Sequence, residues 1–147
     1  MKKIGLVACT KRKLGAHNNS RKYLSKRIYI GRRFRKAKEI ILRKIGCNNW
    51  LVLSSKYNLL EKDKKISYYN MYLKEKEELY KKEWSKIVIE KLKNKYDLSN
   101  TVFYIFAEDC YYKNLLNDIH CFIFNYDEKK NKWDLNNSIE YIYGIRQ

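Results

Sequence analysis

Proline is absent from the 147-residue chain. No apolar segment is long enough to cross a membrane, which takes about 20 residues in a helix. The apolar stretch Ile4–Cys9 near the N-terminus has six residues, fewer than the roughly 7–15 of a secretory signal core. We therefore expect no membrane span and no signal peptide, and we predict a cytoplasmic protein in a reducing compartment.

Metal-ligating residues are also scarce. The four cysteines form no CxxC pair, and only His17 and His120 could add imidazole ligands, so the spacing of a zinc site is missing. Because a reducing compartment disfavours disulfides, we expect the cysteines to be partly buried free thiols. The sequence thus predicts neither a metal nor another cofactor.

Acidic residues are nearly missing from the first third of the chain. Residues 1–44 contain 16 Lys and Arg but a single acid, Glu39, which gives this segment a formal charge of +15 out of +17. The remaining residues are almost neutral, at +2. Such an asymmetry is typical of proteins that bind a polyanion, because each cation that neutralises a phosphate releases counterions. We predict DNA or RNA as the partner.

The basic third has two other interpretations. A composition rich in Lys, Asn, Ile and Tyr is typical of an AT-rich genome, which raises the lysine content without function. That bias does not explain the arginines of this segment, which are Arg12, Arg21, Arg27, Arg32, Arg33, Arg35 and Arg43. An anionic membrane surface is disfavoured, because the segment lacks a broad apolar face with Trp or Phe anchors.

Apolar segments alternate with stretches of helical periodicity, and no repeat or linker divides the chain. The predicted strands are Ile4–Cys9, Asn49–Ser54, Thr101–Ala107 and Cys121–Asn125. The predicted helices are Gly31–Ile45, Lys74–Lys95, Tyr111–Ile119 and Asn137–Arg146. This order predicts one three-layer α/β domain over residues 1–147, with a central, mostly parallel sheet of about four strands.

Several details of these elements follow from the pattern. Gly46 is expected to cap the first long helix, and residues 61–72 are expected to form a polar, Tyr-rich connection. Residues 129–137 are predicted as a loop. The side chains of the helix Lys74–Lys95 that are expected to face inward or to snorkel are Leu79, Trp84, Ile87, Val88, Lys91 and Leu92.

Polar segments follow three of the predicted strands. They are Thr10–Lys13, Ser54–Tyr57 and Glu108–Tyr111. Because ligands of parallel α/β sheets bind outside the carboxyl ends of the strands, we expect these segments to meet at one edge.

The first segment and the helix that follows it are candidates for binding phosphates. Backbone N–H groups and basic side chains of such a loop can hold a phosphate, although the segment lacks the P-loop pattern. A solvated basic loop is the alternative. The residues that we expect to hold a nucleic-acid backbone are Thr10, Lys11, Arg12, Lys13, Arg32, Arg33, Arg35 and Lys36.

The second segment offers a hydroxyl, an ammonium and an aromatic ring. Ser55 and Lys56 have the chemistry of a nucleophile and its base, as in some hydrolases. Tyr57 could stack on an unpaired base. Tyr69 and Tyr111 are further candidates for this contact, with burial in the core as the alternative for each tyrosine.

The third segment supplies the only carboxylates directly after a core strand. A carboxylate there can activate water or stabilise a cationic, sugar-like transition state. The alternative is capping of the helix that follows. We favour catalysis for Glu108 and capping for Asp109.

These motifs resemble a family of small, mostly uncharacterised bacterial and phage domains. Cys-Thr-Lys-Arg-Lys (9–13) is similar to its Ser-Cys-x-Lys-Lys-Lys, and Leu-Ser-Ser-Lys-Tyr-Asn-Leu-Leu (53–60) to its Leu-Ser-Ala-Lys-Tyr-Gly-Leu-Leu. Asn58 replaces the family's Gly, and Asn also tolerates the left-handed conformation. Ala107…Tyr111-Tyr112…Leu115-Leu116 and Tyr143–Gln147 resemble two further signatures.

The family is distantly similar to YaaA-type peroxide-stress DNA-binding proteins and to the uracil-DNA-glycosylase-like domain of archaeosine-forming enzymes. The resemblance implies a uracil-DNA-glycosylase-like fold. It also implies an enzyme that acts on a base, often a modified one, in DNA or RNA by cleaving an N-glycosidic bond. Two alternatives stay open: a non-enzymatic DNA- or RNA-binding module of a phage or defence system, and a hydrolase or transferase of free nucleotides.

Overall fold

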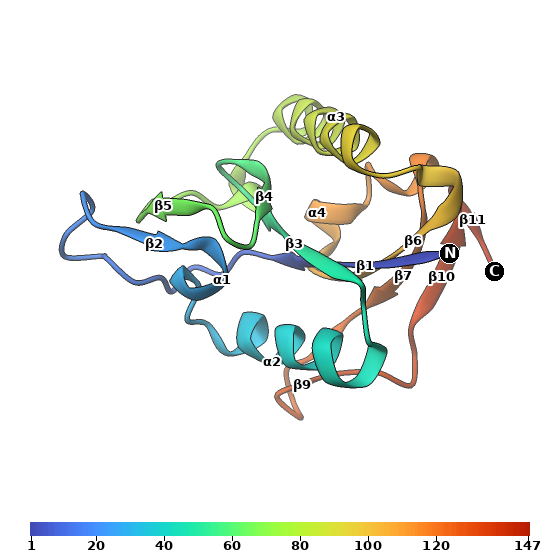
Figure 1. The fold of residues 1–147 in the computed structure, drawn as a ribbon, viewed down its shortest axis with the longest axis horizontal. Coiled ribbons are helices and arrows are strands. Elements are labelled where there is room, and N and C mark those ends of the chain that lie inside the picture. Colours follow the sequence, from blue (N-terminus) through green and yellow to red (C-terminus); the bar gives the residue numbers. More distant parts are fainter.

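The computed structural model describes all residues 1–147 and has three layers, with a central sheet between helices (Figure 1). The sheet has seven strands in the order β11-β10-β7-β6-β1-β3-β4. In that order their bounds are Ile145–Arg146, Ile139–Ile142, His120–Phe124, Thr101–Phe106, Lys2–Ala8, Asn49–Ser54 and Asn58–Glu61. None of the helices combines the length and the apolar composition that a membrane span requires.

The four predicted strands form the centre of the sheet. β7, β6, β1 and β3 are mutually parallel, so the α/β class is confirmed. The sheet is nevertheless larger than the expected four strands, because β4, β10 and β11 add antiparallel strands at its edges. Asn58, the first residue of β4, has a φ of 60°, the left-handed conformation that Asn tolerates.

The C-terminal helix predicted over Asn137–Arg146 is wrong. This segment forms the hairpin β10–β11, in which Ile142 pairs with Ile145 across a two-residue turn. Both turn residues, Tyr143 and Gly144, have positive φ, as the tight turn of a hairpin requires. Pairing of β10 with β7 supplies the backbone hydrogen bonds that a helix would have supplied locally.

Helix α3 (Glu78–Lys95) covers one face of the sheet. Its buried side chains include Trp84, Val88 and Leu92, as expected from their spacing. Leu79 and Ile87, which were also predicted to face inward, are 70% and 41% exposed. At about 100° per residue, Leu79 lies on the side of the helix opposite the stripe that Trp84 and Val88 define, whereas Ile87 lies beside that stripe.

The opposite face is covered by α2 (Arg32–Ile40). The helix continues as a π-helical turn, Ile41–Ile45, and ends at Gly46, whose φ of 70° confirms the predicted cap. The hairpin of β8 (Tyr126–Asp127) and β9 (Lys132–Trp133) packs beside it, where a loop was predicted. Trp133 anchors this hairpin, because its indole N–H donates to the carbonyl of Arg33 at 3.0 Å.

The predicted helix Tyr111–Ile119 is replaced by two short pieces. They are α4 (Asp109–Tyr112) and a 3₁₀ turn, Leu116–Asp118. Tyr111, Leu115 and Ile119 are all buried, so the apolar pattern identifies the inward side chains although the backbone differs. A separate projection is formed by β2 (Lys22–Leu24), α1 (Ser25–Ile28) and β5 (Lys65–Ser67) (Figure 1).

A buried chain of hydroxyl groups joins three segments next to the carboxyl edge of the sheet. The hydroxyl of Tyr69 lies 2.7 Å from that of Tyr29 and 2.8 Å from that of Ser54. Ser54 also accepts the backbone N–H of Tyr57 at 3.0 Å. Burial raises the pKa of Tyr29 and Tyr69 far above the usual value, so both stay protonated hydrogen-bonding groups.

We predict that Tyr69→Phe lowers the free energy of unfolding by about 1–3 kcal/mol, because it leaves the buried hydroxyls of Tyr29 and Ser54 with fewer partners. Tyr68→Phe is the matched control, since the Tyr68 ring is half-buried and its hydroxyl has no protein partner. Urea unfolding followed by circular dichroism measures both variants. Equal stability of the two would show that the hydroxyl chain contributes nothing.

Candidate active-site cleft

A cleft of about 1300 Å³ lies at the carboxyl ends of β1 and β6. Its walls come from the loop after β1, the first residues of α2, the segment Asn70–Lys76 and the hairpin β8–β9. The first and third of the predicted polar segments therefore do meet at this edge. The second segment, Ser54–Tyr57, contributes no residue to the lining, whereas Asn70, Met71 and Tyr72 do.

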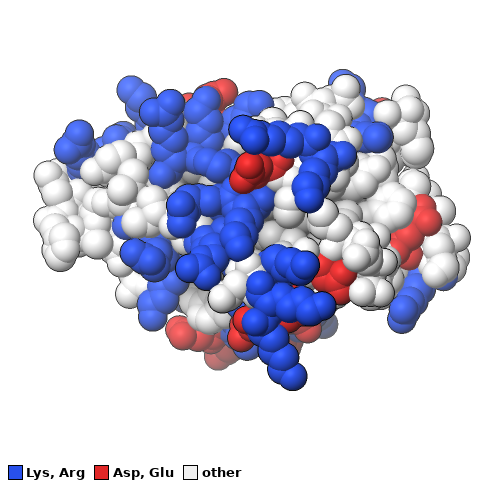
Figure 2. Space-filling view, turned by 90° about the horizontal axis from the view of Figure 1, so that it is seen from below, with Lys and Arg blue, Asp and Glu red and all other residues white.

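Cations dominate the lining of the cleft. Seven basic residues contribute to it, namely Lys11, Arg12, Lys13, Arg32, Arg33, Lys74 and Lys76. The carboxylates are Glu75, Glu108 and Glu128. Lys and Arg side chains also gather over the neighbouring face that carries α2, with few acidic side chains between them (Figure 2). A polyanion approaching from this side meets a positive field that leads to the cleft.

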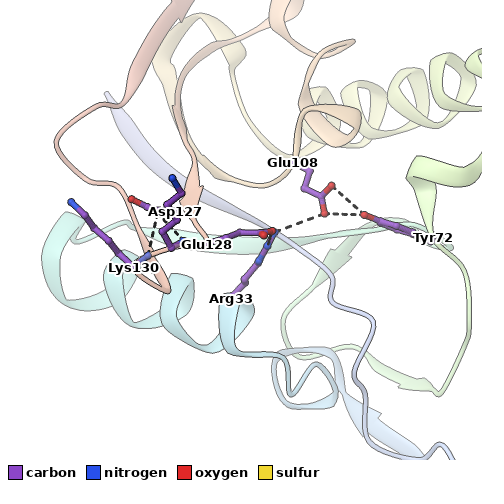
Figure 3. A network of polar contacts seen from close by, with 7 residues as sticks. Arg33, Tyr72, Glu108, Asp127, Glu128 and Lys130 are labelled. Atoms are coloured by element: carbon purple, nitrogen blue, oxygen red, sulfur yellow. Dashed lines mark hydrogen bonds and ion pairs between the residues drawn. The ribbon is translucent and has the colours of Figure 1, made fainter.

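Glu108 is held at the end of β6 by a neutral donor. It occupies the residue before α4, but its side chain makes no capping hydrogen bond. The hydroxyl of Tyr72 instead donates to the carboxylate, at 3.0 and 3.2 Å from its two oxygens (Figure 3). Burial, reinforced by this hydrogen bond, raises the pKa of Tyr72 to about 12, so the phenol stays a donor at neutral pH. The Glu108 side chain is 39% exposed and thus open to a ligand.

Arg33 lies between two carboxylates (Figure 3). Its guanidinium forms a close ion pair with Glu128 and lies 4.0 Å from Glu108. The same group lies over the ring of Tyr126, 4.6 Å from the centroid. Asp127 shapes the turn that carries Glu128, because its carboxylate accepts the backbone N–H groups of Lys129 and Lys130.

A thiol and an ammonium lie on the β1 side of the cleft. Cys9 Sγ is 3.4 Å from the hydroxyl of Tyr111 and accepts the backbone N–H of Ser55 at 3.4 Å. Lys13 is buried, with its Nζ 4.4 Å from the centroid of the Tyr69 ring. Burial lowers the pKa of Lys13, and the nearby Cys9 acts weakly in the opposite direction.

Ser55 and Lys56 are not brought together as a nucleophile and its base. The Ser55 side chain is fully buried and donates to the carbonyl of Met71 at 2.7 Å. Lys56 is exposed, and its Nζ lies over the ring of Tyr57 at 5.2 Å. Neither residue lines the cleft, because the segment before Leu73 covers the end of β3.

The tyrosines predicted to stack on a base are mostly inside the protein. Tyr69 and Tyr111 are 5% and 3% exposed, and each ring makes an edge contact with a neighbouring aromatic ring. Tyr111 still reaches the cleft, near Cys9. Tyr57 is half-buried outside the lining. The rings of Tyr69 and Tyr111 therefore offer no free face to a base.

Three other predicted residues lie away from the cleft. Asp109 is exposed in the first turn of α4 and does not cap it, since the capping position belongs to Glu108. Arg35 is exposed on α2, and Lys36 donates to the carbonyl of Asn131 at 2.5 Å. These two cations can serve the basic face beside the cleft, whereas Thr10, Lys11, Arg12, Lys13, Arg32 and Arg33 line the cleft itself.

Among the cleft residues that sequence reasoning missed are Tyr72, Tyr126, Glu128 and Trp133. The Tyr-rich composition of residues 61–72 was a signal for Tyr72. The other three belong to the hairpin β8–β9, whose position depends on the contact of Trp133 with α2. Only the tertiary structure reveals that contact.

The family of unknown function DUF6884 matches residues 4–138. Comparisons with curated proteins and with solved structures gave no match. The matched residues include all three polar segments and the whole lining of the cleft. This agrees with the expected membership of a small uncharacterised domain family. The chain belongs to the DUF6884 family.

Proposed function

We propose that the protein is a nucleic-acid-directed enzyme that cleaves the N-glycosidic bond of a base in DNA or RNA. The observation that carries this proposal is the position of Glu108, a partly exposed carboxylate directly after a core strand in a cleft lined by seven cations. The cations can neutralise the phosphates of the substrate, and the carboxylate can stabilise the positive charge that develops on the sugar during the reaction.

The reaction assigned to this site is a hydrolysis. As the bond between the base and C1′ of the sugar breaks, the sugar takes on oxocarbenium character, which the negative charge of Glu108 stabilises. Glu108 also accepts a proton from the water that adds to C1′ and releases it to solvent, while the departing base takes up a proton from solvent, so that the net reaction adds one water across the bond. The hydrogen bond from Tyr72 fixes the orientation of the carboxylate.

An extruded base needs an aromatic or apolar surface against which to pack. The cleft offers the ring of Tyr72, which is 39% exposed, and that of Tyr126, which is half-buried beneath Arg33. These rings replace Tyr57 and Tyr69 as the stacking surfaces of the proposal.

We also propose that the scaffold is related to the uracil-DNA-glycosylase fold. Support comes from the four central parallel strands, the helices on both faces and a cleft at the carboxyl ends of the strands. Fold similarity alone does not assign a reaction, so the proposal depends on Glu108 and its surroundings.

A second candidate is a non-enzymatic nucleic-acid-binding module. The observation that favours it is the partnering of Glu108, which already accepts a hydrogen bond from Tyr72 and lies near Arg33. In that case the carboxylate would only position two side chains of the cleft. The two candidates differ in the expected effect of removing the charge of Glu108.

We predict that Glu108→Gln lowers turnover at least about 100-fold, the range of a general base, and changes nucleic-acid affinity less than twofold. Glu90→Gln on the exposed face of α3 is the control. Oligonucleotides with modified bases are scored for abasic sites by alkaline cleavage. Undiminished turnover in Glu108→Gln would exclude Glu108 as the catalytic group, and a wild type without turnover would favour the binding module.

We predict that the double variant Arg12→Ala and Arg32→Ala weakens binding and flattens its salt dependence. Each lost phosphate contact should reduce the slope of log K against log salt by about 0.7–0.9. Fluorescence anisotropy between about 50 and 200 mM salt measures binding to single-stranded DNA, duplex DNA and RNA. The double variant Lys82→Ala and Lys93→Ala on the exposed face of α3 is the control, because it also removes two positive charges. An unchanged slope in the double variant would place the interface elsewhere.

A further inference from the structure

The N-terminus of α2 opens into the cleft, where the N–H of Gly31 donates to the Thr10 hydroxyl at 3.3 Å and the N–H groups of Arg32, Arg33 and Phe34 have no protein acceptor. Gly31, Arg32 and Arg33 line the cleft, and no side chain caps the helix. The first turn contains no acidic residue. The first N–H groups of a helix lack intrahelical acceptors and carry a partial positive charge. Two arginines at this end add to that charge, an arrangement that an anion would stabilise.

Lys13 provides a second, independent indication of an anion. Its side chain lines the cleft although the residue is only 6% exposed. Its Nζ donates one hydrogen bond, to the carbonyl of Lys11 at 3.3 Å, and forms no ion pair. The other neighbours are the rings of Tyr29, Tyr68 and Tyr69, at 4.4–6.0 Å. A buried ammonium with unused donors is costly unless an anion accepts from it.

The segments that carry the two features lie side by side, because the loop after β1 pairs with the chain that enters α2. The backbone N–H of Ile30 donates to the carbonyl of Arg12 at 3.1 Å, and the backbone N–H of Leu14 donates to the carbonyl of Ile28 at 2.9 Å. Thr10 packs directly on Gly31, where an added Cβ would lie 2.7–2.9 Å from the Thr10 side chain. Glycine thus permits the close approach that sets the Thr10 hydroxyl beside the helix N-terminus.

We propose that the N-terminus of α2, Thr10 and Lys13 form a phosphate-binding subsite of the cleft. Backbone N–H groups and the ammonium would donate to the phosphate oxygens, as at other anion-binding helix termini. Arg33 is already paired with Glu128, so the subsite itself is built from the backbone N–H groups and Lys13. The identity of the ligand rests on the proposed function: the phosphate belongs to the nucleotide whose sugar lies at Glu108.

The test is a titration of the ¹⁵N-labelled full chain with sodium phosphate at constant ionic strength. The expected result is saturable shifts of the backbone N–H signals of Arg32, Arg33 and Phe34, with at least tenfold weaker binding by Lys13→Met. Lys22→Met on the exposed strand β2 is the control and should bind like the wild type. Shifts confined to other segments, or equal affinity of Lys13→Met, would overturn the subsite. The wild-type shifts decide the question if Lys13→Met does not fold.

Further titrations identify the source of the phosphate and separate the subsite from the proposed reaction. A nucleoside 5′-monophosphate should bind at least tenfold more tightly than its nucleoside and should cause the same N–H shifts as phosphate. Glu108→Gln should retain this difference in affinity and these shifts. Equal binding of the two compounds would overturn the subsite. Phosphate shifts in a protein that releases no base would contradict the proposed reaction only, whereas base release without these shifts would contradict the subsite only.

Discussion

The position of β1 between β3 and β6, parallel to both, is the constraint on which the rest of the structure depends. Parallel neighbours cannot be joined by tight turns, so the chain must cross over the faces of the sheet between them. The crossovers place α2 on one face and α3 on the other. They also bring the ends of β1 and β6 together, as the 3.4 Å contact between Cys9 and Tyr111 shows.

The segments that form and support the walls of the cleft are held together by polar contacts between parts of the chain that are distant in sequence. Buried hydroxyls tie Tyr69 to Tyr29 and Ser54, and the indole of Trp133 ties the hairpin β8–β9 to α2. Each contact joins segments at least 15 positions apart in the chain. The charged side chains of the cleft therefore reach their positions only when the sheet and both crossovers have formed.

The sequence predicts the four central strands because each is a continuous apolar run, and it predicts that Lys11 and Glu108 meet because parallel strands end at one edge. It does not predict β10–β11 or the hairpin β8–β9, whose hydrogen bonds and packing come from distant segments. It also cannot show that Ser55 is covered, since that depends on its bond to Met71. Local patterns carry no information about such contacts.

The two carboxylates near Arg33 differ in how closely they approach its guanidinium. Arg33 is in close contact with Glu128 but lies 4.0 Å from Glu108. Its charge is therefore largely compensated by the hairpin, while Glu108 receives a hydrogen bond from a neutral phenol. A carboxylate held in this way keeps its negative charge available to a ligand. The proposed reaction needs such a charge beside the sugar, and this arrangement depends on a hairpin that lies outside the seven-stranded sheet.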